Sequence, residues 1–196
     1  MSGTKSNQEF GRYSYALLLG ALLAWTGPAA AEQRDATGIK SAVLFVQSGA
    51  GEGDTSSYTI GATWQWNWSH DFSFGRATGY TEVAVGRWAT RDSDGDHNWV
   101  TQVGITPVIR LHPYSQFSDW FVEAGVGLNL IRPFYQTDDK RFSTEFNFGD
   151  HIGIGREFGS RERQEVSVRL QHFSNAGIRE PNPGENFVQV RYSSRY

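Results

Sequence analysis

The feature that most constrains the fold of this sequence is an alternation of apolar with small or polar residues. The run from Trp120 to Leu130 shows it best. Its even-numbered positions are apolar: Trp120, Val122, Ala124, Val126, Leu128 and Leu130. Its odd-numbered positions are mostly polar or small: Phe121, Glu123, Gly125, Gly127 and Asn129. Because successive side chains of a β-strand point to opposite faces, this period of two predicts strands with one apolar face.

Eight runs have this strand character: residues 39–48, 58–68, 76–88, 99–111, 120–130, 145–158, 165–175 and 186–196. Their length is close to the roughly 9–11 residues of a tilted transmembrane strand, and bacterial outer-membrane barrels have an even number of strands. The 14% of aromatic residues and the 22 glycines also favour a barrel over helices. We therefore predict an all-β fold, an eight-stranded antiparallel transmembrane barrel of the outer membrane.

Two further patterns orient this barrel. Tryptophans near the ends of the runs predict aromatic girdles at the membrane interfaces: Trp66, Trp68, Trp88, Trp99 and Trp120. The connections 49–57, 89–98, 131–144 and 176–185 are longer than 69–75, 112–119 and 159–164, as expected for outer loops and periplasmic turns. The seventh run then ends at the outer surface. A soluble lipocalin-like barrel, with its apolar face inward, is the alternative that the period leaves open.

The N-terminus is predicted to be a signal peptide. Lys5 and Arg12 precede an apolar run at residues 16–25, which is too short to span a bilayer, and small residues follow at 29–31. Cleavage after Ala31 would leave residues 32–196 as the barrel domain. An uncleaved interfacial helix is the alternative for this segment.

Composition and motifs exclude several kinds of site. The absence of cysteine excludes disulfides, zinc-thiolate centres and cysteine catalysis, and a net charge of −3 gives no support for nucleic-acid binding. The acidic stretch from Asp92 to Asp96 lacks the glycine and glutamate positions of an EF-hand, so we interpret it as an acidic outer loop. We expect no metal and no cofactor. His151 is predicted to face the lumen as a hydrogen-bonding group.

His172 and Ser174 are the strongest candidates for chemistry. They continue the apolar face of Val166, Val168 and Leu170, and residues two apart on a strand lie about 6.5–7 Å apart at Cα on one face. A serine beside a histidine base is the arrangement that acyl transfer needs. Because that face is predicted to meet the membrane, the substrate is expected to be a lipid ester. The following connection and strand offer Asn175 and amides near Gly177 to an oxyanion, and Glu185 or Asn186 as the group that orients the histidine.

Two segments, residues 146–155 and 172–182, resemble the lipid A 3-O-deacylases, the PagL family. Residues 64–68 and 121–127 are also similar to it, and the segment His-Phe-Ser-Asn-Ala-Gly at 172–177 is the most specific part. The resemblance implies an outer-membrane barrel that hydrolyses the ester-linked 3-O-acyl chain of lipid A, within lipopolysaccharide and among outer-membrane lipids, without a required metal. It also implies that His172 is the base and Ser174 the nucleophile.

The position of the orienting acid departs from the family pattern. The resemblance implies a glutamate at the start of the last strand, and an ungapped count from His172 places it at Asn186. The alternation agrees, since Asn186 shares the face of Val188 and Val190. We nevertheless favour Glu185, because a carboxylate stabilises an imidazolium better than an amide does.

Two other functions remain open from the residues alone. A non-enzymatic outer-membrane barrel, acting as a structural anchor or an adhesion protein, would use the same fold without needing His172 or Ser174. A phospholipase would use the same pair on a different ester. Whether the barrel forms a homodimer is also left open.

Overall fold

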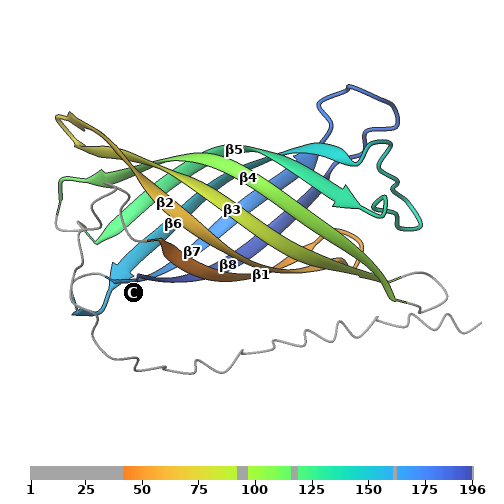
Figure 1. Ribbon diagram of the computed structural model, residues 1–196, viewed down its shortest axis with the longest axis horizontal. Helices are drawn as coiled ribbons and strands as arrows, with labels where there is room; N and C mark the ends of the chain where they lie inside the picture. Colours follow the sequence, from red (N-terminus) through yellow and green to blue (C-terminus); the bar gives the residue numbers. More distant parts are fainter. Residues whose placement is uncertain (1–41, 92–96, 116–118, 161–162, 196) are drawn as a thin grey trace, which may run out of the picture.

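The protein is an eight-stranded antiparallel barrel, closed by pairing of β8 with β1 (Figure 1). The computed structural model describes residues 42–91, 97–115, 119–160 and 163–195. The strands are β1 (Val43–Gly51), β2 (Ser56–Phe72), β3 (Gly75–Arg91), β4 (His97–Pro113), β5 (Trp120–Arg132), β6 (Phe146–Phe158), β7 (Gln164–Ser174) and β8 (Glu185–Arg195). Closure leaves no unpaired sheet edge, so every strand satisfies its backbone groups within the wall. The predicted fold class is confirmed. The predicted signal peptide at 1–31 and the acidic stretch from Asp92 to Asp96 lie outside the described residues.

The strand boundaries differ from the predicted ones mainly in β2, β3 and β4, which each span 17 residues. Pairing between β1 and β2 continues to Ala50 and Ser56, so the first connection shrinks to residues 52–55. A register shift between Gln65 and Ser69 interrupts β2, which the regular Trp-x-Trp-x-Trp alternation did not indicate. The connections after β5 and β7 stay long, and Figure 1 shows them together at the end of the barrel opposite the C-terminus.

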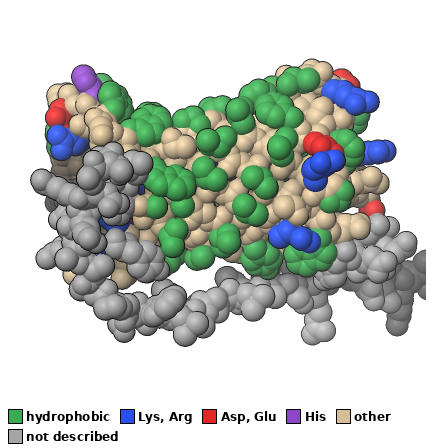
Figure 2. Space-filling model, in the orientation of Figure 1, with side chains coloured by type: hydrophobic (Ala, Val, Ile, Leu, Met, Phe, Trp, Pro, Cys, Tyr) green, Lys and Arg blue, Asp and Glu red, His purple; other side chains and the backbone are tan. Residues whose placement is uncertain are grey.

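The outer wall of the barrel is apolar. Aliphatic side chains such as Val46, Ile60, Val126 and Leu170 are more than half exposed. Figure 2 shows hydrophobic side chains spread over the wall, while charged ones gather toward the two ends. This arrangement contradicts the lipocalin-like alternative, in which the apolar face would line the interior. Within the part of the chain that the structure describes, no helix is long and apolar enough to cross a membrane.

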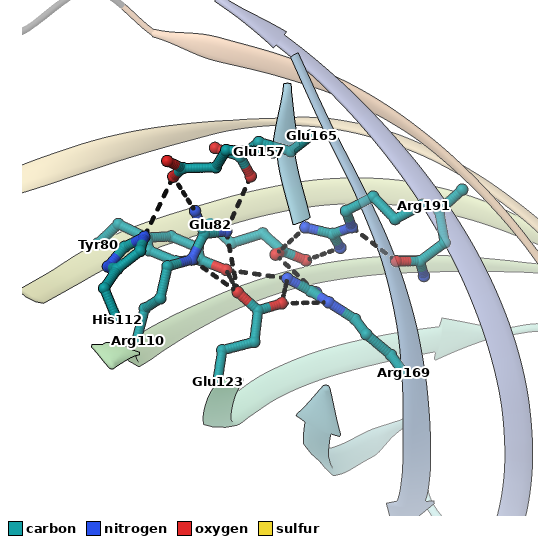
Figure 3. Close-up of polar contacts among 10 residues, drawn as sticks. Tyr80, Glu82, Arg110, His112, Glu123, Glu157, Glu165, Arg169 and Arg191 are labelled. Carbon is teal, nitrogen blue, oxygen red and sulfur yellow. Dashed lines mark hydrogen bonds and ion pairs between the residues drawn. The ribbon is translucent and has the colours of Figure 1, made fainter. Parts of the chain in front are cut away.

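A charged network fills the interior (Figure 3). Arg169 is 1% exposed and pairs with both Glu82 and Glu123, while Arg110 bridges Glu123 to Glu165. Burying charges is costly unless each one is paired and hydrogen-bonded, and these groups are. The lumen is therefore narrow and filled by side chains. His151 also points inside, as predicted, but its Nε2 has no hydrogen-bond partner among the described residues.

An aromatic cluster closes the barrel at the end that carries the long loops. Its buried members are Trp88, Val100, Ile131, Tyr135, Phe142, Phe173 and Phe187. The prediction that Trp88 belongs to an interfacial girdle is wrong, because it shares the inward parity of Glu82 and Ala84 in β3. The ring of Trp88 lies 4.8 Å from Phe173 and 4.9 Å from Phe187 between centroids. The cluster thereby anchors β7 and β8 from the inside.

Candidate active site

The parity of β7 and β8 directs the predicted site residues to the outer wall. Phe173 and Phe187 are buried in the aromatic cluster, so their neighbours His172, Ser174 and Asn186 point outward. The antiparallel register sets His172 directly opposite Asn186, and on its other side opposite Asp150 of β6. The register therefore places one residue from each of three neighbouring strands, β6, β7 and β8, side by side on the outer wall.

His172 is hydrogen-bonded to Asn186. The Nδ1 atom of the imidazole lies 2.7 Å from Oδ1 of Asn186, and Nδ2 of the same amide donates to Oε1 of Glu52 over 2.6 Å. Because a carboxylate only accepts, the amide nitrogen must face Glu52 and the amide oxygen must face the ring. Nδ1 of His172 therefore carries the hydrogen. In the neutral ring this leaves Nε2 free to accept a proton.

Ser174 is the last residue of β7, and its side chain lies on the same face as that of His172. It lies opposite Phe148 of β6, and its side chain is partly exposed. Within the described ranges the Ser174 hydroxyl makes no hydrogen bond, to His172 or to any other group. Hydrogen bonds between a nucleophile and its base often tighten only in the substrate complex. The structure thus places the pair on one face, without a bond between them.

Glu185 does not contact His172, contrary to our preference for it as the orienting acid. It pairs in register with the inward-facing Phe173, and its side chain is completely buried. Its carboxylate accepts from the hydroxyl of Tyr135 (2.9 Å), from Nζ of Lys140 (3.1 Å) and from the backbone amide of Glu52 (2.7 Å). The regular alternation of β8 is maintained at its first residue, so Asn186, the alternative position, faces the imidazole.

The predicted oxyanion donors are engaged within the loop that follows β7. The backbone amide of Asn175 donates to Oδ1 of Asn182. The side-chain Nδ2 of Asn175 donates to Oγ of Ser143 and to the carbonyl of Arg179. The amide of Gly177 donates to Oδ1 of Asn175. Asn175 is buried and holds the loop in shape, rather than presenting a free amide as expected.

The amide of Ala176 is left available between these two residues. Ala176 and Gly177 have positive φ values of 53° and 78°, an uncommon conformation for alanine. No hydrogen bond from the Ala176 amide occurs in the described part of the chain. Residues held in such sparsely populated backbone conformations cluster at active sites and ligand-binding loops.

Glu52 and Lys140 complete the site, and sequence analysis identified neither of them. Lys140 lies in the connection between β5 and β6, and its Nζ contacts both Glu52 and Glu185. The hydrogen bond from Lys140, and after it the one from Asn186, holds the pKa of the Glu52 carboxyl below its usual value. Because Glu52 is 134 residues from Asn186, no local pattern could have paired them.

The wall beside His172 is apolar. Ile152, Leu170 and Val188 flank it, each more than half exposed, and they line a groove of about 1090 Å³ together with His172 and Asn186. Acyl chains are recognised by apolar surface of this kind. Among the described residues, no cluster of three histidine, aspartate or glutamate side chains is placed to hold a metal ion.

Comparisons with known proteins agree with one another. The family model of the lipid A 3-O-deacylases (PagL) matches residues 57–195. The lipid A deacylase PagL of Bordetella bronchiseptica is 37% identical over 134 residues, which cover 66% of this chain and 70% of that protein. The lipid A deacylase PagL of Pseudomonas aeruginosa is 31% identical over 138 residues, covering 69% of this chain and 76% of the relative.

A solved structure shares the fold. The crystal structure of the outer membrane enzyme PagL superposes with a TM-score of 0.67 at 27% identity, covering 79% of this chain and 99% of that one. Since the family model spans most of the sequence and relatives above 30% identity agree with it, this chain belongs to the lipid A 3-O-deacylase (PagL) family of outer-membrane barrels.

Proposed function

We propose that this protein hydrolyses the 3-O-acyl ester of lipid A, with Ser174 as nucleophile, His172 as general base and Asn186 as the group that orients the base. The observation that carries the proposal is the hydrogen bond from His172 Nδ1 to Asn186, because it directs Nε2 of the ring to the task of a base. Family membership supports the choice of ester.

The chemistry follows from these roles. Nε2 of His172 takes the hydroxyl proton of Ser174 as Oγ attacks the carbonyl carbon of the ester. The tetrahedral intermediate collapses, and the 3-oxygen of the sugar leaves with the proton from His172. Water then attacks the acyl-serine with the same base. The fatty acid is released, and Ser174 regains its proton.

The loop after β7 suits stabilisation of the oxyanion. The positive-φ segment at Ala176 and Gly177 lies just after Ser174 in the chain, and of its two amides the one of Gly177 already donates to Asn175. In this proposal the amide of Ala176 donates to the oxyanion, and Asn175 fixes the loop that presents it.

The outward position of the site explains how substrate arrives. A lipid that diffuses in the outer leaflet reaches the wall laterally, with its acyl chains along Ile152, Leu170 and Val188. A water-soluble ester without long acyl chains would gain little from contact with this apolar wall. The proposal therefore includes a lipid-facing active site.

Lipid A mass spectra of cells expressing the protein test this function. Wild-type protein should remove one ester-linked hydroxyacyl chain, and Ser174→Ala should reduce the rate by at least about 10³-fold. Ser48→Ala, another outer-wall serine on β1, is the matched control and should leave the activity intact. Intact lipid A with a correctly folded wild-type barrel would instead favour a phospholipase or a binding protein.

A further inference from the structure

We propose that Glu52 is a positioning residue for this reaction, supplying His172 through Asn186 with the negative charge that Asn186 itself lacks. The inference rests on the proposed function and adds to it a residue from the opposite end of the sequence. It requires a continuous path from the carboxylate to the imidazole.

The hydrogen bonds provide that path. Oε1 of Glu52 accepts from Nδ2 of Asn186 over 2.6 Å, and Oδ1 of the same amide accepts from Nδ1 of His172 over 2.7 Å. Carboxylate, amide and imidazole are thus joined by two short bonds. Hydrogen bonds in series polarise one another, so the charge on Glu52 strengthens the acceptor that the ring meets.

The charge matters when the base is protonated. After His172 takes the serine proton, the ring becomes an imidazolium, and a nearby anion stabilises it. An amide alone orients the ring but carries no charge. Glu52 takes up no proton in this scheme, since both hydrogens of the Asn186 amide stay on nitrogen.

Glu52 is held in place by contacts on its other side. Its backbone amide donates to the buried carboxylate of Glu185 over 2.7 Å, and its Oε2 pairs with Lys140. The side chain of Glu52 therefore faces Lys140 and Asn186, and its backbone amide faces Glu185. His172 lies on the far side of Asn186. This arrangement also gives Glu185 a role, which is to fix the backbone that carries Glu52.

Kinetics on lipid A in detergent micelles provide the first test. Glu52→Gln keeps an acceptor for Asn186 but removes the charge, and with it the ion pair to Lys140, so kcat should fall about ten- to a hundredfold with KM unchanged. Asp54→Asn removes the same charge from the same exposed connection, where no contact with the site is formed, and should leave kcat unaltered. An equal loss in both variants would overturn the proposal.

A rescue experiment separates positioning from a structural role. Asn186→Glu in the Glu52→Gln background places a carboxylate directly on His172, and should restore most of the lost kcat. If Glu52 merely held its connection in shape through Lys140 and Glu185, the loss would persist in the double variant. If kcat stays low in a folded double variant, the proposed action of Glu52 on His172 through Asn186 is refuted.

Nitrogen-15 NMR of the histidine rings tests the action of Glu52 on His172 without any substrate. In the wild type His172 should be the Nδ1–H tautomer with a downfield Nδ1 proton, which moves upfield in Glu52→Gln and not in Asp54→Asn. A wild type that shows this signal but leaves lipid A intact would contradict the proposed function alone. An unchanged His172 spectrum together with unchanged kcat in Glu52→Gln would contradict this inference alone.

Discussion

Nδ1 of His172 and Oδ1 of Asn186 lie 2.7 Å apart across the β7–β8 pair, in a register that sets the two residues directly opposite each other. An amide at this position is chemically sufficient to orient an imidazole, as the Cys-His-Asn arrangement of papain-like proteases illustrates. The orientation of the His172 ring is thereby fixed by the wall of the barrel, and the nearest carboxylate in this chain of hydrogen bonds is Glu52, one residue farther away.

Removal of the amide should impair catalysis. Asn186→Ala leaves Nδ1 of His172 without its acceptor, so the ring loses both its orientation and its preferred tautomer. We expect kcat to fall about 100-fold or more, with a folded barrel. Kinetics on lipid A check this, and Asn67→Ala, an exposed asparagine on β2, is the matched control. Wild-type kcat in Asn186→Ala would show that another group orients His172.

Glu185 should matter for stability rather than for proton transfer. Glu185→Gln keeps the buried shape but weakens the bonds from Tyr135 and Lys140, so the free energy of unfolding should fall by about 2 kcal/mol. Urea unfolding in lipid vesicles measures this. Glu145→Gln, in an exposed ion pair with Arg132, should change stability by less than about 1 kcal/mol. Wild-type stability in Glu185→Gln would show that these hydrogen bonds do not hold the fold.

Much of the fold follows from the alternation alone. In β5 every residue predicted to face inward is buried and every one predicted to face outward is exposed. The strand is regular over its whole length, so the alternation alone assigns each side chain to its face. The pairing of His172 with Ser174 on one face is likewise a property of the strand period. The register shift in β2 was not predictable, since it depends on how β2 pairs with β3. The inward position of Trp88 was not predicted either, since it depends on the space that the closed barrel leaves for the buried cluster.

The parts of the site that sequence analysis missed are contacts between distant loops. Glu52 reaches Asn186 only because barrel closure brings β1 next to β8. Our preference for Glu185 followed the chemistry of carboxylates over the parity of the strand, and parity was the better guide. A carboxylate does serve the site in our proposal, but it comes from the connection after β1.

Gly184 should be essential for the position of the histidine. It has a φ of 67°, and a Cβ built on it would lie 2.7 Å from Cε1 of His172. Gly184→Ala should therefore displace the ring as well as strain the backbone, so we expect kcat to fall at least about tenfold. Gly159→Ala has a similar φ of 81° but only ordinary contacts at the other end of the barrel, and should keep full kcat. Equal activity of the two variants would mean that the ring tolerates displacement.

Removing one charge from the lumen should destabilise the barrel far more than breaking one of its surface ion pairs. Arg169→Met removes a buried guanidinium and leaves Glu82 and Glu123 with fewer partners in a space that water does not reach. Breaking a buried pair from one side costs about 3–5 kcal/mol, because the remaining charge stays desolvated. Arg156→Met breaks an exposed pair with Asp119 and should cost less than about 1 kcal/mol. Urea unfolding in vesicles distinguishes the two, and equal effects would mean that water enters the lumen and screens Arg169.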